Sequence, residues 1–385
     1  MLRKSFTLTL VFPTLLIILL ILYPQQSLQA AREGFALFTG SVLPSLLPFF
    51  AAASLFVALG GAHWVGRILE PVMRHVFHCP GIAGYVLVMS FLSGYPMGAR
   101  LTADLYAQGQ ITKADARRMT ILCSTSGPVF ITGAVGAGML GNSRAGLLIL
   151  LAHYAAVLIT GFLWRGGKLS QPPVRVSIPK PLPFGESLGK AVKSAVESIF
   201  TICGFVVLFA VIIAQLTQTG VIALLAQGLS PVLQLLQLPP DLAQAMLGGM
   251  IEMTTGCRLA AETTAPLVSK CAVIAAAISF GGFSIHAQTF AFTAKCGMRP
   301  WHYFIAKCMH ALFAFCFTVI LGRFLIRPDA AAAYVDYTGA YFMPIPTFVN
   351  TLHIALLYCG FAAVLLIIML VLDYMDYRAR KKGKS

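Results

Sequence analysis

Long stretches without a charged residue decide what this chain can fold into. The longest, from Ser198 to Pro240, holds 43 residues without Asp, Glu, Lys or Arg, whereas one bilayer crossing needs only about 20 apolar residues. Only 11% of the 385 residues are charged and 58% are hydrophobic, against about a quarter charged in soluble domains. The pattern predicts an all-α polytopic membrane protein and excludes a cytosolic enzyme, a disulfide-rich secreted domain and a disordered chain.

The basic excess has a membrane explanation. A net charge of +15 could attract nucleic acid, but no nucleic-acid motif accompanies it, and lysines and arginines gather in the loops that stay in the cytoplasm. The nine cysteines form no CxxC pair and no Cys/His metal spacing. We therefore expect no nucleic-acid partner, no disulfide framework, no metal and no cofactor.

The two halves of the chain resemble each other. Similar positions recur in the same order at displacements of 157 to 160 residues, and such recurrence predicts an internal duplication. The matching pairs are Leu69–Val72 with Leu229–Val232, Gly98–Leu101 with Gly256–Leu259, and His153 with His310.

Charge then predicts the topology. We expect each repeat to combine about three spans with one re-entrant helical hairpin, near 81–108 and 242–264, which gives about eight full crossings with the flanking helices. This arrangement leaves 22 of the 28 basic residues inside, makes the second repeat inverted and puts both termini in the cytoplasm. The expected parts are an uncleaved N-terminal transmembrane helix (1–33), repeat 1 (34–165), a cytoplasmic linker (166–193), repeat 2 (194–326), and an extracytoplasmic segment with the last helix and a basic tail (327–385).

The hairpin of the first repeat contains a helix break. Glycines and a proline interrupt its apolar run, and freed backbone groups are tolerated in a membrane only inside protein or around a water-filled cavity. Secondary transporters bind substrate at such breaks, although a simple kink would also explain the residues. The substrate-binding residues expected here are Ser93, Gly94, Tyr95, Pro96, Gly98 and Arg100.

The second hairpin has a matching break that carries charge. Glu252 lies deep in apolar sequence, where a charge must face a cavity or a partner, so it is the candidate for a coupling ion, a proton or sodium. Arg100 and Arg258 occupy equivalent places, and two planar guanidinium groups suit a small dicarboxylate. Two alternatives stay open: a structural pair of Glu252 with Arg258, and arginines at the membrane surface. Thr254, Thr255, Gly256 and Arg258 are the expected substrate contacts.

Two further breaks follow the hairpins. Ser126 and Gly127 interrupt one apolar run, and Ser284 and His286 adjoin the break in its repeat partner. Small hydroxyl residues beside glycine can contact a ligand, or they can serve close helix packing.

These breaks carry a family resemblance. SGYPMGARL at 93–101, STSGPVFITGAVG at 124–136 and EMTTGCRLA at 252–260 resemble the YlbJ-type sporulation integral membrane proteins, which contain the nucleoside-recognition (Gate) domain. The resemblance covers about residues 35–325 and implies a role in spore formation. It also implies movement of dipicolinate, a pyridine dicarboxylate, across the mother-cell-derived outer forespore membrane.

The expected function is transport of a small organic anion. No GxSG-type serine site and no HExxH motif is present, so we do not expect an enzyme. A transporter of nucleosides or other small solutes remains an alternative, as does a non-transporting structural protein of spore cortex formation. The expected partners are the anion, a coupling ion and membrane lipid.

Overall fold

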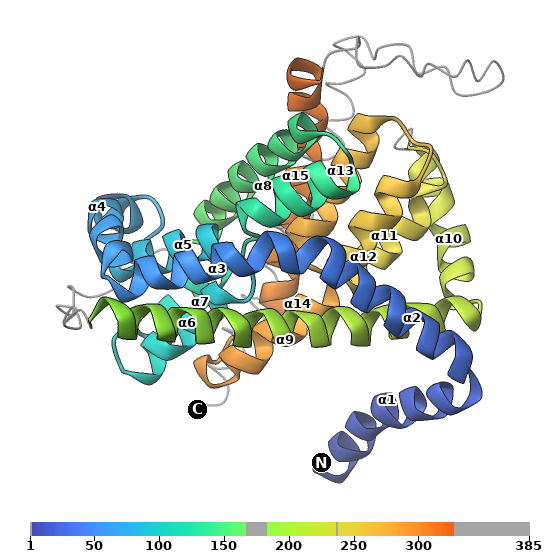
Figure 1. Cartoon of the computed structure of the whole chain (residues 1–385), viewed down its shortest axis with the longest axis horizontal. Coiled ribbons are helices and arrows are strands. Elements are labelled where there is room, and N and C mark those ends of the chain that lie inside the picture. The colour runs from blue at the N-terminus through green and yellow to red at the C-terminus, as the bar shows by residue number, and fades with distance from the viewer. Residues whose placement is uncertain (1, 167–182, 236–237, 327–385) are drawn as a thin grey trace, which may run out of the picture.

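The computed structural model describes residues 2–166, 183–235 and 238–326, and within these ranges it is helical throughout, without a strand (Figure 1). The all-α prediction is thereby confirmed. The helices are α1 (Leu2–Leu22), α2 (Pro24–Leu37), α3 (Leu43–Ala58), α4 (Gly61–His75), α5 (Ile82–Ser93), α6 (Met97–Ala107), α7 (Lys113–Leu122), α8 (Ser143–Leu163), α9 (Phe184–Gln218), α10 (Val221–Leu235), α11 (Leu242–Ile251), α12 (Met253–Glu262), α13 (Leu267–Phe280), α14 (Gly282–Thr293) and α15 (Pro300–Leu325), with π-helical segments η1 (Phe38–Val42) and η2 (Phe130–Met139) and a 3-10 turn η3 (Ala294–Cys296).

Two long helical elements lie along each other across the molecule. α2, η1 and α3 follow one another without a break, and α9 packs against both α2 and α3 (Figure 1). On α9 a stripe at four-residue spacing is buried, which places one face of the helix toward its neighbours; it consists of Ser187, Ala191, Ala195 and Ile199. Small residues in this stripe let the helices approach closely.

The order of elements repeats in the two halves. A helix, a helical hairpin, a broken helix and a long helix follow one another as α4, α5–α6, α7–η2 and α8, and again as α10, α11–α12, α13–α14 and α15. Pairs of short helices, α5–α6 and α11–α12, lie in the ranges 81–108 and 242–264 where the sequence predicts hairpins; that they are re-entrant stays a prediction. The last helices of the two halves, α8 and α15, pack together, and α13 packs on both. The inversion of the second repeat in the membrane stays a prediction.

Four helices of the described ranges are long and apolar enough to cross a bilayer: Ser143–Leu163, Phe184–Gln218, Leu267–Cys296 and Pro300–Leu325. A fifth span results if the pair 10–22 and 24–40 is counted as one; these two helices meet at an angle of 105°, with Pro24 at the first position of α2. The predicted boundary at residue 33 lies inside α2. The expected last helix, the basic tail and most of the linker lie outside the described residues.

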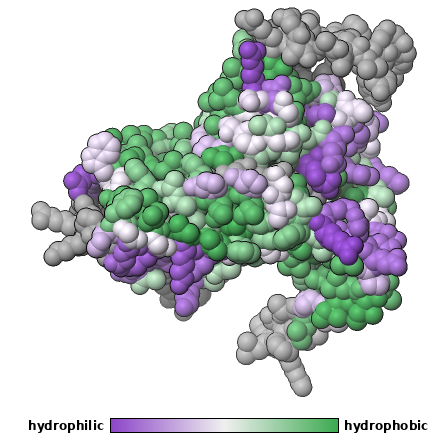
Figure 2. Space-filling model, in the orientation of Figure 1, coloured by the Kyte–Doolittle hydropathy of each residue, from purple (hydrophilic) through white to green (hydrophobic). Residues whose placement is uncertain are grey.

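The outer face of the long helices is apolar. Figure 2 shows hydrophobic atoms over the region of α3 and α9, with hydrophilic atoms gathered toward the margins of this view. Large exposed side chains on α9 include Leu188, Val192, Phe200 and Leu208. Such a surface suits lipid contact. The buried polar side chains include several at the helix breaks, among them Ser93, Ser126 and Glu252.

Candidate functional site

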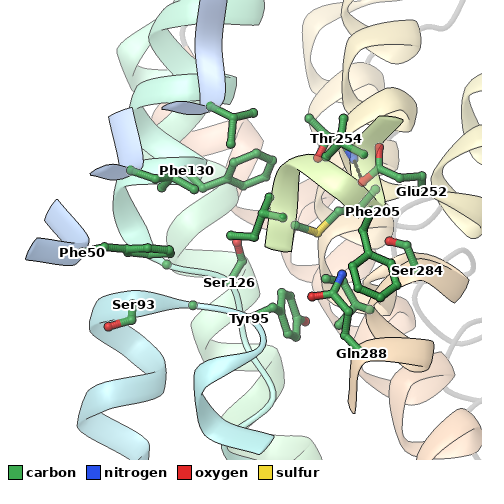
Figure 3. Close-up of a pocket in the computed structure, with 18 residues that line it drawn as sticks. Phe50, Ser93, Tyr95, Ser126, Phe130, Phe205, Glu252, Thr254, Ser284 and Gln288 are labelled. Atoms are coloured by element: carbon green, nitrogen blue, oxygen red, sulfur yellow. Dashed lines mark hydrogen bonds between the residues drawn. The ribbon is translucent and has the colours of Figure 1, made fainter. Parts of the chain in front are cut away.

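Four helix breaks meet around one pocket. They are the tip between α5 and α6, the interruption between α7 and η2, the tip between α11 and α12, and the junction of α13 and α14 (Figure 3). α3 and α9 close the pocket with Phe50 and Phe205, and Phe130 of η2 adds a third aromatic ring. The pocket therefore has aromatic walls and polar groups supplied by the breaks.

Two polar atoms in this pocket lack partners. Ser93 and Gln288 are 4% and 2% exposed and both line the pocket. Ser93 Oγ and Gln288 Oε1 make no hydrogen bond to any other described residue. Buried polar atoms are nearly always hydrogen-bonded, so these two atoms point to a bound polar molecule.

Glu252 caps a half-helix with its own side chain. It is the N-cap residue of α12, where Oε1 accepts from the Thr254 N–H at 2.9 Å and Oε2 from the Thr255 N–H at 2.7 Å. The N-terminal end of a helix favours a negative group. The pocket thus holds a carboxylate without any arginine.

The alternative pair of Glu252 with Arg258 is wrong. Arg258 Nη1 donates to both carboxylate oxygens of Glu262, at 2.9 and 3.0 Å. These residues are four apart on α12, the spacing at which side chains on one helix face meet. Arg258 therefore points along α12 instead of toward the tip.

A buried lysine lies behind the wall of the pocket. Lys307 of α15 is 1% exposed, and its Nζ lies 2.7 Å from the Tyr95 hydroxyl, 3.0 Å from the Ser124 carbonyl oxygen and 3.1 Å from His310 Nδ1. Tyr95 itself lines the pocket and donates to the carbonyl of Ile278 on α13 at 3.2 Å. One ammonium group thus joins the first hairpin tip, the break after α7 and α15.

Backbone partners fix the tautomers of two histidines beside this lysine. His153 Nε2 accepts from the Ser126 N–H at 3.0 Å, so Nδ1 carries the hydrogen and donates to Ser279 Oγ at 2.7 Å. His310 Nε2 donates to the His153 carbonyl at 3.1 Å, which leaves its Nδ1 as an acceptor. Both rings are neutral in this arrangement.

The family to which this chain belongs can now be stated. The Gate family, described as nucleoside recognition, matches residues 39–143 and 199–298. The sporulation integral membrane protein YlbJ of Bacillus subtilis (strain 168) is 34% identical over 324 residues, which is 78% of this chain and 79% of that protein. The chain belongs to the Gate family. Its two matched stretches begin 160 residues apart, which supports the duplication.

More distant likenesses are also found. The uncharacterized protein YjiH of Escherichia coli (strain K12) is 26% identical over 34% of this chain and 57% of its own. Among solved structures, a variant of CNTnw in an outward-facing state aligns with a TM-score of 0.50 at 14% identity, covering 83% of this chain and 84% of the other. That likeness concerns the fold alone.

The Gate-family pocket gathers part of the residue set expected from the sequence. Its lining includes residues from all four predicted breaks; those predicted from the sequence are Ser93, Gly94, Tyr95, Ser126, Gly127, Glu252, Thr254 and Ser284. Pro96, Thr255 and Arg100 lie close by in sequence but do not line it, and neither does Arg258. The paired arginines are therefore not brought together with the other predicted residues.

Three predicted residues instead serve packing. A Cβ on Gly98 would lie 1.8 Å from the Cys123 carbonyl oxygen, and one on Gly256 would lie 2.2 Å from the Gly249 Cα. His286 donates from Nε2 to the Phe280 carbonyl at 3.1 Å and stacks edge-on against Tyr303. These contacts hold the breaks together, and none of the three residues lines the pocket.

Sequence reasoning missed Gln288, the aromatic walls and Lys307. Lys307 was not singled out from the sequence, although it is the one charged residue of the apolar run 300–322 and lies three positions before His310. A lysine and a histidine on one face of such a run were the available signal.

Proposed function

We propose that this Gate-family membrane protein transports a small organic anion through the pocket between the four helix breaks. The chain is a multi-pass, transporter-like membrane protein, and its membership of the Gate family supports a small-solute substrate. The observation that supports an anion is the position of Glu252, whose carboxylate accepts hydrogen bonds from the backbone N–H groups of Thr254 and Thr255 at the start of α12. Substrate carboxylates can be bound in the same way at neighbouring half-helices.

The pocket offers further helix starts. Its lining includes Gly94 and Tyr95 just before α6, Gly127 just before the turn that leads into η2, and Ser284 in the first turn of α14. Each of these helices begins at a break, so its positive end lies near the pocket. Because these partial charges replace arginine, the anion needs no guanidinium contact.

The walls favour a flat ring. Phe50, Phe130, Phe205 and Tyr95 supply aromatic faces, and such faces pack well against planar ligands. The unpartnered atoms of Ser93 and Gln288 would hydrogen-bond the ring or its substituents. Dipicolinate, a flat pyridine dicarboxylate, is the first candidate. The similarity to a sporulation integral membrane protein supports the outer forespore membrane as the location of the protein, and the distribution of its basic residues supports cytoplasmic termini.

A nucleoside is the second candidate substrate. Glu252 and Gln288 present acceptor oxygens to the pocket, and sugar hydroxyls are donors. The family description, nucleoside recognition, agrees with this chemistry. The two candidates differ in charge, so one experiment separates them.

The test is uptake into liposomes that contain the purified protein. We expect saturable uptake of labelled dipicolinate that unlabelled dipicolinate inhibits and uridine does not. Gln288→Leu should reduce uptake roughly 5- to 150-fold, since a buried group left without its partner costs about 1–3 kcal/mol, whereas Gln29→Leu on the exposed face of α2 should not. Uptake of uridine and not of dipicolinate would show that the substrate is a nucleoside and not the anion. Uptake of neither would favour the structural role.

A further inference from the structure

Lys307 is a buried cation that forms no ion pair with any residue that the structure describes. Its side chain is enclosed by the first hairpin tip, by the break after α7, and by α8 and α14. The ion pairs found in the described ranges involve other residues, among them Arg74–Glu70, Arg118–Asp115, Lys190–Glu186 and Arg258–Glu262. A charge in this position is costly inside a membrane protein and marks function by default. The pocket chemistry described above does not use it.

With His310 neutral, the hydrogen bonds around Lys307 require the charged form of the lysine. Tyr95 donates its hydroxyl hydrogen to the Ile278 carbonyl, so its oxygen accepts from Lys307. The Ser124 carbonyl can only accept, and His310 Nδ1 accepts because Nε2 carries the ring hydrogen. Three acceptors need three N–H donors, which an ammonium has and a neutral amine lacks.

We propose that Lys307 is a proton-binding site that couples proton movement to transport, its charged form holding the tip of the α5–α6 hairpin against α15. The assignment rests on the transport function proposed above. Loss of the proton leaves one of the three acceptors without a donor, and Tyr95 is the contact that joins α15 to the pocket wall. Deprotonation therefore releases the hairpin tip, and movement of the tip in turn favours deprotonation.

The other titratable groups around Lys307 do not replace it in this role. They are Tyr95 from the hairpin tip, His153 from α8, His286 from α14, and Tyr303 and His310 from α15 itself. His153 and His310 use one ring nitrogen each as an acceptor, which a second proton would abolish. Lys307 is thus the member of this cluster whose protonation the hydrogen bonds demand.

The sign of the pH effect follows. The charged lysine stabilises the closed tip, so closure is complete at low pH and weakens as the pH rises through the titration of Lys307. For one proton, the open fraction should grow about tenfold per pH unit above the midpoint.

The test is hydrogen–deuterium exchange of the peptide covering residues 93–101, measured against pH and corrected for intrinsic exchange. Wild-type protein should show the tenfold slope. In Lys307→Met this peptide should exchange fast at every pH. In Lys307→Arg, whose guanidinium does not lose its proton, it should exchange slowly at every pH. The control Lys190→Met, on a side chain 62% exposed, should behave as wild type. A flat wild-type profile would overturn the proposal, and so would a slope that survives in Lys307→Met but disappears in Glu252→Gln.

Liposomes separate this proposal from that of the substrate. A pH gradient, and not a sodium gradient, should drive accumulation of dipicolinate in wild type, while Lys307→Met should only equilibrate it. Accumulation by Lys307→Met equal to wild type would contradict proton coupling at Lys307. If the wild type moves no solute, the transport function fails, and the exchange slope still decides whether Lys307 binds the proton that closes the hairpin.

Discussion

The two hairpins occupy equivalent places in the two halves, yet they are held in opposite ways. The tip of α5–α6 carries no charge and is tied to its neighbours through Tyr95, which contacts α13 and Lys307 of α15. The tip of α11–α12 carries Glu252, whose charge is satisfied within its own hairpin by the N-terminus of α12. The two tips are thus held in different ways. The first tip is hydrogen-bonded to a lysine of another helix, and the second carries its own carboxylate, which caps the helix that follows it.

Glycine packing follows the same division. Gly98 of the first hairpin abuts the carbonyl of Cys123 at the end of α7, whereas Gly256 of the second abuts Gly249 of its own partner helix α11. At these two positions the first hairpin is fixed by a neighbouring helix and the second by its own partner helix. Substitutions should disturb the first through its neighbours and the second through its own fold.

The largest effect is expected from Gly98→Ala. A Cβ 1.8 Å from a carbonyl oxygen cannot be accommodated without moving the hairpin from α7, and overpacking costs about 1–3 kcal/mol or more. The midpoint temperature of thermal unfolding in detergent and the abundance of the protein in the membrane should both fall. Gly204→Ala on α9, where nothing lies within 4 Å, should leave both unchanged or slightly improved. Normal stability of Gly98→Ala would show that the contact is not rigid.

Tyr95→Phe should have the next largest effect. It leaves Lys307 and the Ile278 carbonyl each short of a partner, at about 1–3 kcal/mol, and it should raise hydrogen exchange at residues 93–101 while residues 242–262 stay protected. Tyr106→Phe, on the partly exposed part of α6, is the matched control. Equal loosening of both hairpins would contradict the separation drawn above.

Glu252→Gln should cost less, about 0.3–2 kcal/mol, because the amide oxygen still accepts one N–H while the interaction of the charge with the helix end is lost. The change should appear as faster exchange at 253–258 and not at the first tip. Its readout in uptake is a stronger preference for anionic over neutral solutes, because the negative group that repels an anion in the pocket is gone.

Arg258→Ala should have the smallest effect, about 0.5 kcal/mol or less, as expected for an exposed pair four residues apart on a helix. Since Arg258 pairs with Glu262 and not with Glu252, the double variant Arg258→Ala with Glu252→Gln should be additive within about 0.5 kcal/mol. Recovery of stability in the double variant would instead indicate a direct interaction between Glu252 and Arg258.

The helix breaks could be predicted from the sequence, but the residues that reach them from distant parts of the chain could not. Uncharged runs and the glycine and proline interruptions predict the helices and both hairpins, because these signals are local. Lys307 and Tyr95 are 212 residues apart, and no local pattern reports such a contact. The prediction for Arg258 was wrong even though its partner is local, because Arg258 pairs with Glu262, one turn further along the same helix.

The length of α9 links the pocket to the lipid. Its 35 residues extend for about 52 Å, but the charged residues all lie in its first 14 positions, and the uncharged remainder from Ser198 to Gln218 is about 31 Å long, close to the roughly 30 Å hydrocarbon thickness of a bilayer. A thinner bilayer would have to be met by a greater tilt of this helix. Because Phe205 and Val206 on the same stretch form a wall of the pocket, lipid chain length becomes a variable that acts on the shape of the pocket from outside the protein.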